Sequence, residues 1–149
     1  MHDTTDTNLR ILFLCTGNSC RSQMAEGWAR SRNGIEAYSA GIETHGLNPS
    51  AVRVMREAGV DISGQASKHV DDLKDIAFDY VITVCDHASE QCPVFPGTAT
   101  IVHKGFDDPP RLAQEAKSEA EALSHYRRVR DEIGEFVDSM PGSLPPIAT

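Results

Sequence analysis

A short loop pattern, Cys15 followed after five residues by Arg21 and Ser22, carries the clearest chemistry in this chain. The apolar residues directly before Cys15 indicate a strand, and the residues after Ser22 indicate a helix. A loop between a strand and a helix N-terminus directs backbone N–H groups and the positive end of the helix dipole at one point. The sequence therefore predicts a cradle for a tetrahedral oxyanion, with a cysteine at its rim.

The residue types within this loop fit that chemistry. Gly17 lets the backbone approach an anion closely, and Arg21 offers a planar pair of N–H donors to its oxygens. The same donors favour a thiolate, so Cys15 is the candidate nucleophile rather than a buried cysteine of the turn. The candidate oxyanion-binding residues are Thr16, Gly17, Asn18, Ser19, Cys20, Arg21 and Ser22.

Several residues in and near the loop are expected to have mainly structural side chains. Asn18 and Ser22 are expected to hydrogen-bond within the loop, and Cys20 is expected to be a packing thiol. Trp28 is expected to belong to the core of the helix that follows, and His45 is interpreted as a surface or loop residue.

The elements expected around the loop alternate between strand and helix. Predicted strands cover residues 10–14, 36–40, 80–84 and 98–103, and predicted helices cover residues 22–32, 48–58, 71–75 and 118–140. Asn48 followed by Pro49 is typical of a helix start, and Gly59 of a helix end. We expect an α/β fold with a four-stranded parallel sheet flanked by helices, in one domain over residues 1–149 with a flexible tail at 141–149.

Two further chemical segments follow predicted strands, and the carboxyl ends of parallel strands meet at one edge of a sheet. Asp107 and Asp108 precede two prolines in an expected rigid loop, where a carboxylic acid can protonate the leaving oxygen of an oxyanion. A plain surface turn is the alternative. Cys85 and Cys92 flank a polar stretch without apolar periodicity, which favours a redox-active pair over packing.

The composition excludes several classes of function. A net charge of −8 argues against a nucleic-acid partner, and no apolar run approaches the length of a membrane span. The polar start is not typical of a signal peptide. Four cysteines without an export signal indicate a reducing, cytoplasmic location. Their spacings fit no common zinc site, so no metal is predicted.

The residues also identify a family resemblance. The run from Cys15 to Ser22 resembles the catalytic loop of the low-molecular-weight protein tyrosine phosphatases. The longer run from Cys15 to Trp28, with the runs at 38–46 and 127–133, resembles the thioredoxin-coupled arsenate reductases built on that fold. The likeness covers about residues 9–137 and implies a low-molecular-weight phosphatase-like fold.

The resemblance implies a role for each candidate residue. Cys15 attacks arsenate while Arg21 and the loop amides hold the oxyanion, and Asp108 is the general acid. Cys85 then attacks Cys15, which releases arsenite, and Cys92 attacks Cys85 to leave a disulfide that thioredoxin reduces. The expected function is therefore arsenate reduction in arsenic detoxification by a cytoplasmic monomer without a cofactor, with weak phosphatase activity as a side reaction.

One departure from the family pattern concerns a cation. Some relatives bind potassium beside the loop, and Asn18, Glu26 and Ser39 match the first part of that site. Ala66 and Lys68 stand at the later positions, and a lysine ammonium opposes a cation or stands in for one. No potassium site is predicted.

Two other functions remain open from the sequence. A phosphatase usually has an aromatic residue after its Asp-Pro pair, where this chain has Pro110, and it has no use for Cys85 and Cys92. A sensor that binds an oxyanion and responds by forming disulfides has no use for the acid Asp108.

Overall fold

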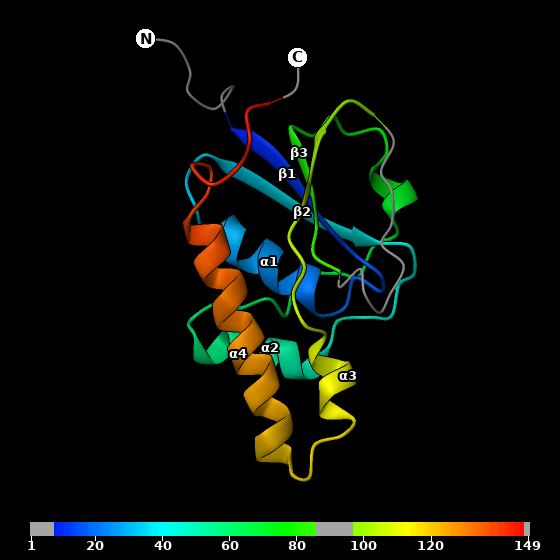
Figure 1. The fold of residues 1–149 in the computed structure, drawn as a ribbon. Coiled ribbons are helices and arrows are strands. Elements are labelled where there is room, and N and C mark those ends of the chain that lie inside the picture. The colour runs from blue at the N-terminus through cyan, green and yellow to red at the C-terminus, as the bar shows by residue number, and fades with distance from the viewer. Residues whose placement is uncertain (1–7, 86–96, 148–149) are drawn as a thin grey trace.

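The computed structural model, which describes residues 8–85 and 97–147, contains one parallel sheet with the strand order β2-β1-β3-β4. The strands are β1 (Leu9–Cys15), β2 (Ile35–Gly41), β3 (Tyr80–Thr83) and β4 (Thr100–His103). They run side by side across the upper half of Figure 1. The predicted four-stranded parallel sheet is confirmed, and β1, which leads into the cysteine loop, lies at its centre.

The central strand β1 is buried on both faces. Ile11 and Phe13 belong to the larger apolar cluster, whereas Leu12 and Leu14 belong to a second cluster, and none of the four is exposed. This division follows from the alternation of side chains along a strand. A continuous apolar run is therefore what a central parallel strand requires.

Helices of unequal size cover the two faces. The larger cluster packs beneath α1 (Arg21–Arg30), α2 (Pro49–Glu57) and α4 (Glu119–Asp138), and the second packs against the 3₁₀-helix η2 (Val70–Leu73). Figure 1 shows α1 and α4 side by side on one side of the sheet and η2 on the other. A short helix, α3 (Pro109–Ala113), packs against the first half of α4.

The helix starts follow local sequence rules. Asn48 is the N-cap of α2, and its side chain accepts hydrogen bonds from the backbone N–H groups of Ser50 and Ala51. The expected rigid loop through Pro109 is wrong in one respect, because Pro109 opens α3. A proline at the first helical position has its φ preset and lacks only an N–H that the helix leaves unpaired.

The segment after α4 returns to the sheet. Leu144 packs against the larger cluster, and the Tyr80 hydroxyl donates a hydrogen bond of 2.5 Å to the carbonyl oxygen of Pro145. These contacts hold the start of the tail on β3, and the flexibility of the tail remains a prediction.

Candidate active site

The loop between β1 and α1 is short and tightly bent. Cys15 is the last residue of β1, and Cys20 is the residue before α1. Asn18 has a φ of 48°, in the left-handed region that asparagine tolerates better than most residues. Gly17 lies against His45, because a Cβ on Gly17 would lie 2.3 Å from Nδ1 of that ring and the ring would have to move. The loop shape therefore depends on these residue types.

Every backbone carbonyl from Thr16 to Cys20 accepts a hydrogen bond on the outer side of the loop. The carbonyls of Thr16, Gly17 and Ser19 accept from the backbone N–H groups of residues 43, 45 and 48 respectively, each at 3.0 Å. The carbonyl of Asn18 accepts from the Gln23 side chain, and that of Cys20 from residue 24. In a trans peptide the N–H points opposite to the C=O, so these bonds direct N–H groups toward the inside of the loop.

Buried side chains brace the loop from behind. Nδ2 of Asn18 donates to Oγ of Ser22 at 2.9 Å, as the sequence predicts, and both residues are completely buried. Oδ1 of Asn18 accepts from the backbone N–H of Lys68 at 2.7 Å and from Nε2 of Gln23 at 3.1 Å. Gln23 was not identified from the sequence as part of the site. Its amide is buried and also donates to the carbonyl of Ala66.

The loop encloses one side of a cavity of about 200 Å³. Since a water molecule takes up about 30 Å³ of liquid, the cavity suits a small ion rather than a large organic group. Two larger surface hollows, of about 490 and 560 Å³, have no cysteine among their described lining residues. The residues that line the small cavity are Cys15, Thr16, Gly17, Ser19, Cys20, Arg21, His45, Asp108 and Pro110.

Arg21 supplies a buried positive charge to this cavity. Its side chain is 3% exposed, and Nη1 donates to the carbonyl oxygen of Phe106 at 3.1 Å. Nη2 lies 3.6 Å from Oδ1 of Asp108. A guanidinium remains charged at any physiological pH, and burial strengthens its attraction for an anion. The predicted meeting of the loop and the acidic segment is therefore present.

The two neighbouring aspartates have different surroundings. Asp107 faces α4, where its carboxylate accepts a hydrogen bond of 3.0 Å from Nη2 of Arg128. Asp108 precedes α3, makes no side-chain cap to that helix, and lines the cavity. The geometry thus places Asp108, and not Asp107, where a proton can reach a bound oxyanion.

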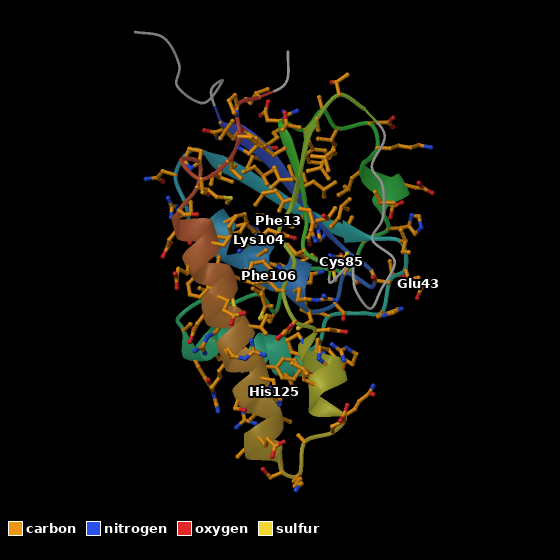
Figure 2. The ribbon with its side chains drawn as sticks, viewed as in Figure 1. Phe13, Glu43, Cys85, Lys104, Phe106 and His125 are labelled. Atoms are coloured by element: carbon orange, nitrogen blue, oxygen red, sulfur yellow. The ribbon has the colours of Figure 1, made fainter. Side chains whose placement is uncertain are left out.

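Three thiols lie at the same edge of the sheet. The thiols of Cys15, Cys20 and Cys85 are buried. Cys85 directly follows the segment that pairs with β1, and its Sγ lies 3.8 Å from the carbonyl oxygen of Leu14, the residue before Cys15. Figure 2 shows Cys85 at the end of the strands beside the loop. Cys92, the third cysteine of the predicted relay, lies outside the described residues.

The surroundings of Cys20 disfavour its thiolate. Removal from water raises the pKa of the Cys20 thiol well above its ordinary value, and the nearby Cys15 raises it further. Arg21 lowers the pKa, but by less. Cys20 therefore stays protonated, in agreement with its expected role as a packing thiol.

A lysine ammonium lies beside the buried carboxylate of Glu26. Nζ of Lys68 donates to the carbonyl oxygen of Ala66 at 2.7 Å and lies 3.7 Å from Oε1 of Glu26. Oε1 also accepts a hydrogen bond of 2.6 Å from Ser39. This cluster supports the loop, because the backbone N–H of Lys68 donates to Asn18. The absence of potassium there stays a prediction.

Other kinds of site are not found in the described part of the chain. No group of three His, Cys, Asp or Glu side chains in residues 8–85 and 97–147 is arranged to hold a metal ion. Within the same residues, no helix has the length and apolar character needed to cross a membrane.

His45 is a further residue of the cavity wall that the sequence analysis did not count among the site residues. It was interpreted as a surface or loop residue, and it is an exposed residue of the loop after β2, where it also lines the cavity. The signal was available, because His45 follows β2, and β2 is the neighbour of β1 in the sheet. Trp28 is half-buried and anchored, since its Nε1 donates to the carbonyl oxygen of Arg130 at 3.1 Å.

The fold and the cysteine loop define a class of protein. The chain belongs to the low molecular weight phosphotyrosine protein phosphatase family, whose sequence profile matches residues 10–140.

Within that class, the chain is similar to several proteins named arsenate reductase. It is 56% identical over 130 residues to an arsenate reductase of Bacillus licheniformis, a match that covers 85% of this chain and 91% of that protein. A solved arsenate reductase in a phosphate-binding state shares 30% identity with a TM-score of 0.73, covering 92% of this chain and 99% of the other. A thioredoxin-dependent arsenate reductase of Corynebacterium glutamicum shares 25% identity with a TM-score of 0.62, covering 91% of this chain and 63% of that one.

Proposed function

We propose that this protein reduces arsenate to arsenite. The observation that carries the proposal is the position of a second buried thiol, Cys85, at the strand end next to the one that holds Cys15. Ester hydrolysis needs only a nucleophile and water, whereas reduction of arsenic(V) needs two electrons, which two thiols supply when they form a disulfide. The similarity to proteins named arsenate reductase supports the same conclusion.

The first step of the proposed reaction uses the cavity itself. The Cys15 thiolate attacks the arsenic of a bound arsenate and forms a sulfur–arsenic bond, while an arsenic–oxygen bond breaks. Asp108 donates a proton to the departing oxygen, which leaves as water. Arg21 and the N–H groups of the loop hold the remaining oxygens throughout.

The second step transfers the electrons. The Cys85 thiolate attacks Sγ of Cys15, a sulfur–sulfur bond forms, and the electron pair of the sulfur–arsenic bond stays with arsenic, which departs as arsenite. Cys92 then attacks Cys85, which frees Cys15 and leaves a Cys85–Cys92 disulfide. A dithiol protein of the thioredoxin class reduces that disulfide and becomes oxidised in turn. A thioredoxin-dependent structural relative supports this choice of donor.

We also propose that the protein works without a metal, as a monomer and in the cytoplasm. A reaction that starts from reduced thiols at Cys15 and Cys85 fits a reducing compartment. Light scattering of the purified protein checks the monomer.

One experiment tests the function. Arsenate-dependent oxidation of NADPH is measured with thioredoxin and thioredoxin reductase present, and hydrolysis of a phosphate ester is measured in parallel. Reduction at many turnovers, with hydrolysis weaker by orders of magnitude, is the expected result. Hydrolysis without any arsenate-dependent oxidation would assign the protein to the phosphatases instead.

A further inference from the structure

His45 lines the oxyanion cavity from an exposed loop, and Glu43 stands two residues before it in that loop. The backbone N–H of Glu43 donates to the carbonyl of Thr16 and that of His45 donates to the carbonyl of Gly17, both at 3.0 Å. Two residues after β2 are thereby fixed to the cysteine loop. Figure 2 labels Glu43 just beyond the tip of β2, beside that loop.

The imidazole ring of His45 has one nitrogen beside Glu43 and the other beside the cysteine loop. Nε2 lies 2.5 Å from Oε1 of Glu43, and it donates to an ionised Glu43 when it carries the hydrogen. The other edge faces the loop, since a Cβ on Gly17 would lie 2.3 Å from Nδ1. Nδ1 is therefore the ring atom nearest the cradle, and in the imidazolium form it carries a second N–H donor.

The charges around the cavity favour a second positively charged donor beside a bound anion. Among the described residues that line the cavity, Arg21 is the other side chain that can carry a positive charge. Asp108 and the Cys15 thiolate are negative when ionised, and the whole chain has a net charge of −8. A doubly charged oxyanion entering this cavity therefore gains from a second cationic donor on the rim.

We propose that His45, oriented by Glu43, contacts the bound tetrahedral oxyanion and contributes to its affinity. His45 then binds oxygens of the ligand from the mouth of the cavity, opposite the buried Arg21. Only the identity of the substrate rests on the proposed function, since inorganic phosphate occupies the same cradle and serves as the probe.

A matched pair of variants tests the contact. His69 also pairs with a carboxylate two residues later, with its Nδ1 3.5 Å from Oδ2 of Asp71, and it does not line the cavity. His69→Asn keeps the side-chain cap that His69 gives to η2. We expect His45→Asn to weaken phosphate binding in calorimetry about 5- to 10-fold, and His69→Asn to leave it unchanged.

Kinetics separate a binding role from a structural one. With thioredoxin and its reductase, His45→Asn should raise the KM for arsenate by the same factor as the Kd for phosphate, with kcat within about twofold. Glu43→Gln should have a smaller effect, about two- to threefold. It should add little in the double variant, because Glu43 acts through His45.

The unmodified protein provides a readout that no folding defect can disturb. The ring resonances of His45 should shift on titration with phosphate and saturate at the calorimetric Kd, while those of His69 stay in place. Unmoved His45 resonances, or an unchanged phosphate Kd in His45→Asn, would overturn the proposal. Phosphate binding that depends on His45 in a protein unable to reduce arsenate would instead reject only the proposed function.

Discussion

The carboxylate of Asp108 lies 3.6 Å from the guanidinium of Arg21, on the wall of the cavity that Cys15 also lines. This pairing brings an acid from the start of α3 to a cation from the start of α1. At this distance the pair is an ion pair rather than a short hydrogen bond, and both groups line the cavity that an oxyanion would enter.

The first prediction concerns the proton donor. Asp108→Asn removes a titratable acid with almost no change in shape, and we expect kcat for arsenate to fall by about 10²-fold or more. Asp107→Asn is the matched control, because Asp107 is bonded to Arg128 outside the cavity. It should keep kcat within about threefold. Equal losses in the two variants would show that the segment, and not the acid, matters.

The second prediction concerns the nucleophile. Cys15→Ser replaces a buried thiol by a poor nucleophile of nearly the same size, so arsenate reduction should fall below detection while the melting temperature changes little. Calorimetric titration with phosphate should still show binding, since Arg21 and the loop amides remain. Measurable turnover of arsenate in Cys15→Ser would contradict the mechanism.

The third prediction concerns the relay. Cys85→Ser and Cys92→Ser should each stop multiple turnover with thioredoxin, because the electron path is cut at successive points. Mass spectrometry of Cys92→Ser after one exposure to arsenate should find a disulfide between Cys15 and Cys85. Wild-type turnover in both variants would exclude the relay.

The fourth prediction follows from the raised pKa of Cys20. The buried thiol stays protonated, so iodoacetamide at pH 7–8 should label Cys15 much faster than Cys20, and phosphate should protect Cys15. The unfolded chain loses the Cys20 proton near its ordinary pKa of about 8.5, whereas the folded chain keeps it. The free energy of unfolding should therefore fall as the pH rises above about 8.5, and less so in Cys20→Ala. Equal labelling of both thiols would argue against this assignment.

The fifth prediction concerns Lys68. Lys68→Met removes the ammonium beside the buried Glu26, and the free energy of unfolding should fall by about 1–2 kcal/mol. Lys74 is exposed, so Lys74→Met is the control and should change stability by less than about 0.5 kcal/mol. Urea denaturation monitored by circular dichroism measures both. A stable Lys68→Met protein would show that the cluster behind the loop does not depend on this cation.

The parts of the fold that the sequence predicted are those with a strong local pattern. The apolar run at Ile11–Leu14 indicated a buried strand, and Asn48 with Pro49 indicated a helix start, because each pattern satisfies a local requirement of the backbone. The start of α3 at Pro109 was missed, since Pro-Pro favours a loop and a helix start equally well.

Within the site, the residues that the sequence analysis missed are held by contacts with residues far away in the sequence. The backbone hydrogen bond from Glu43 to Thr16 joins two loops that a helix and a strand separate in the sequence. No periodic pattern in the sequence predicts it. His45 and Gln23 depend on such bonds for their positions. Cys15 and Arg21 were predicted from residue type and spacing, whereas Asp108 was chosen over Asp107 only through the family resemblance.

The outward hydrogen bonds of the five loop carbonyls bear on how this protein works among competing ions. These hydrogen bonds hold the loop in its binding shape before the ligand arrives, so no closing step adds selectivity. We therefore expect arsenate and phosphate to bind the loop with similar affinity. Where phosphate is abundant, it therefore competes with arsenate for the cavity. The choice between the two ions is made after binding, by which of them loses an oxygen as water under attack by Cys15 before it dissociates.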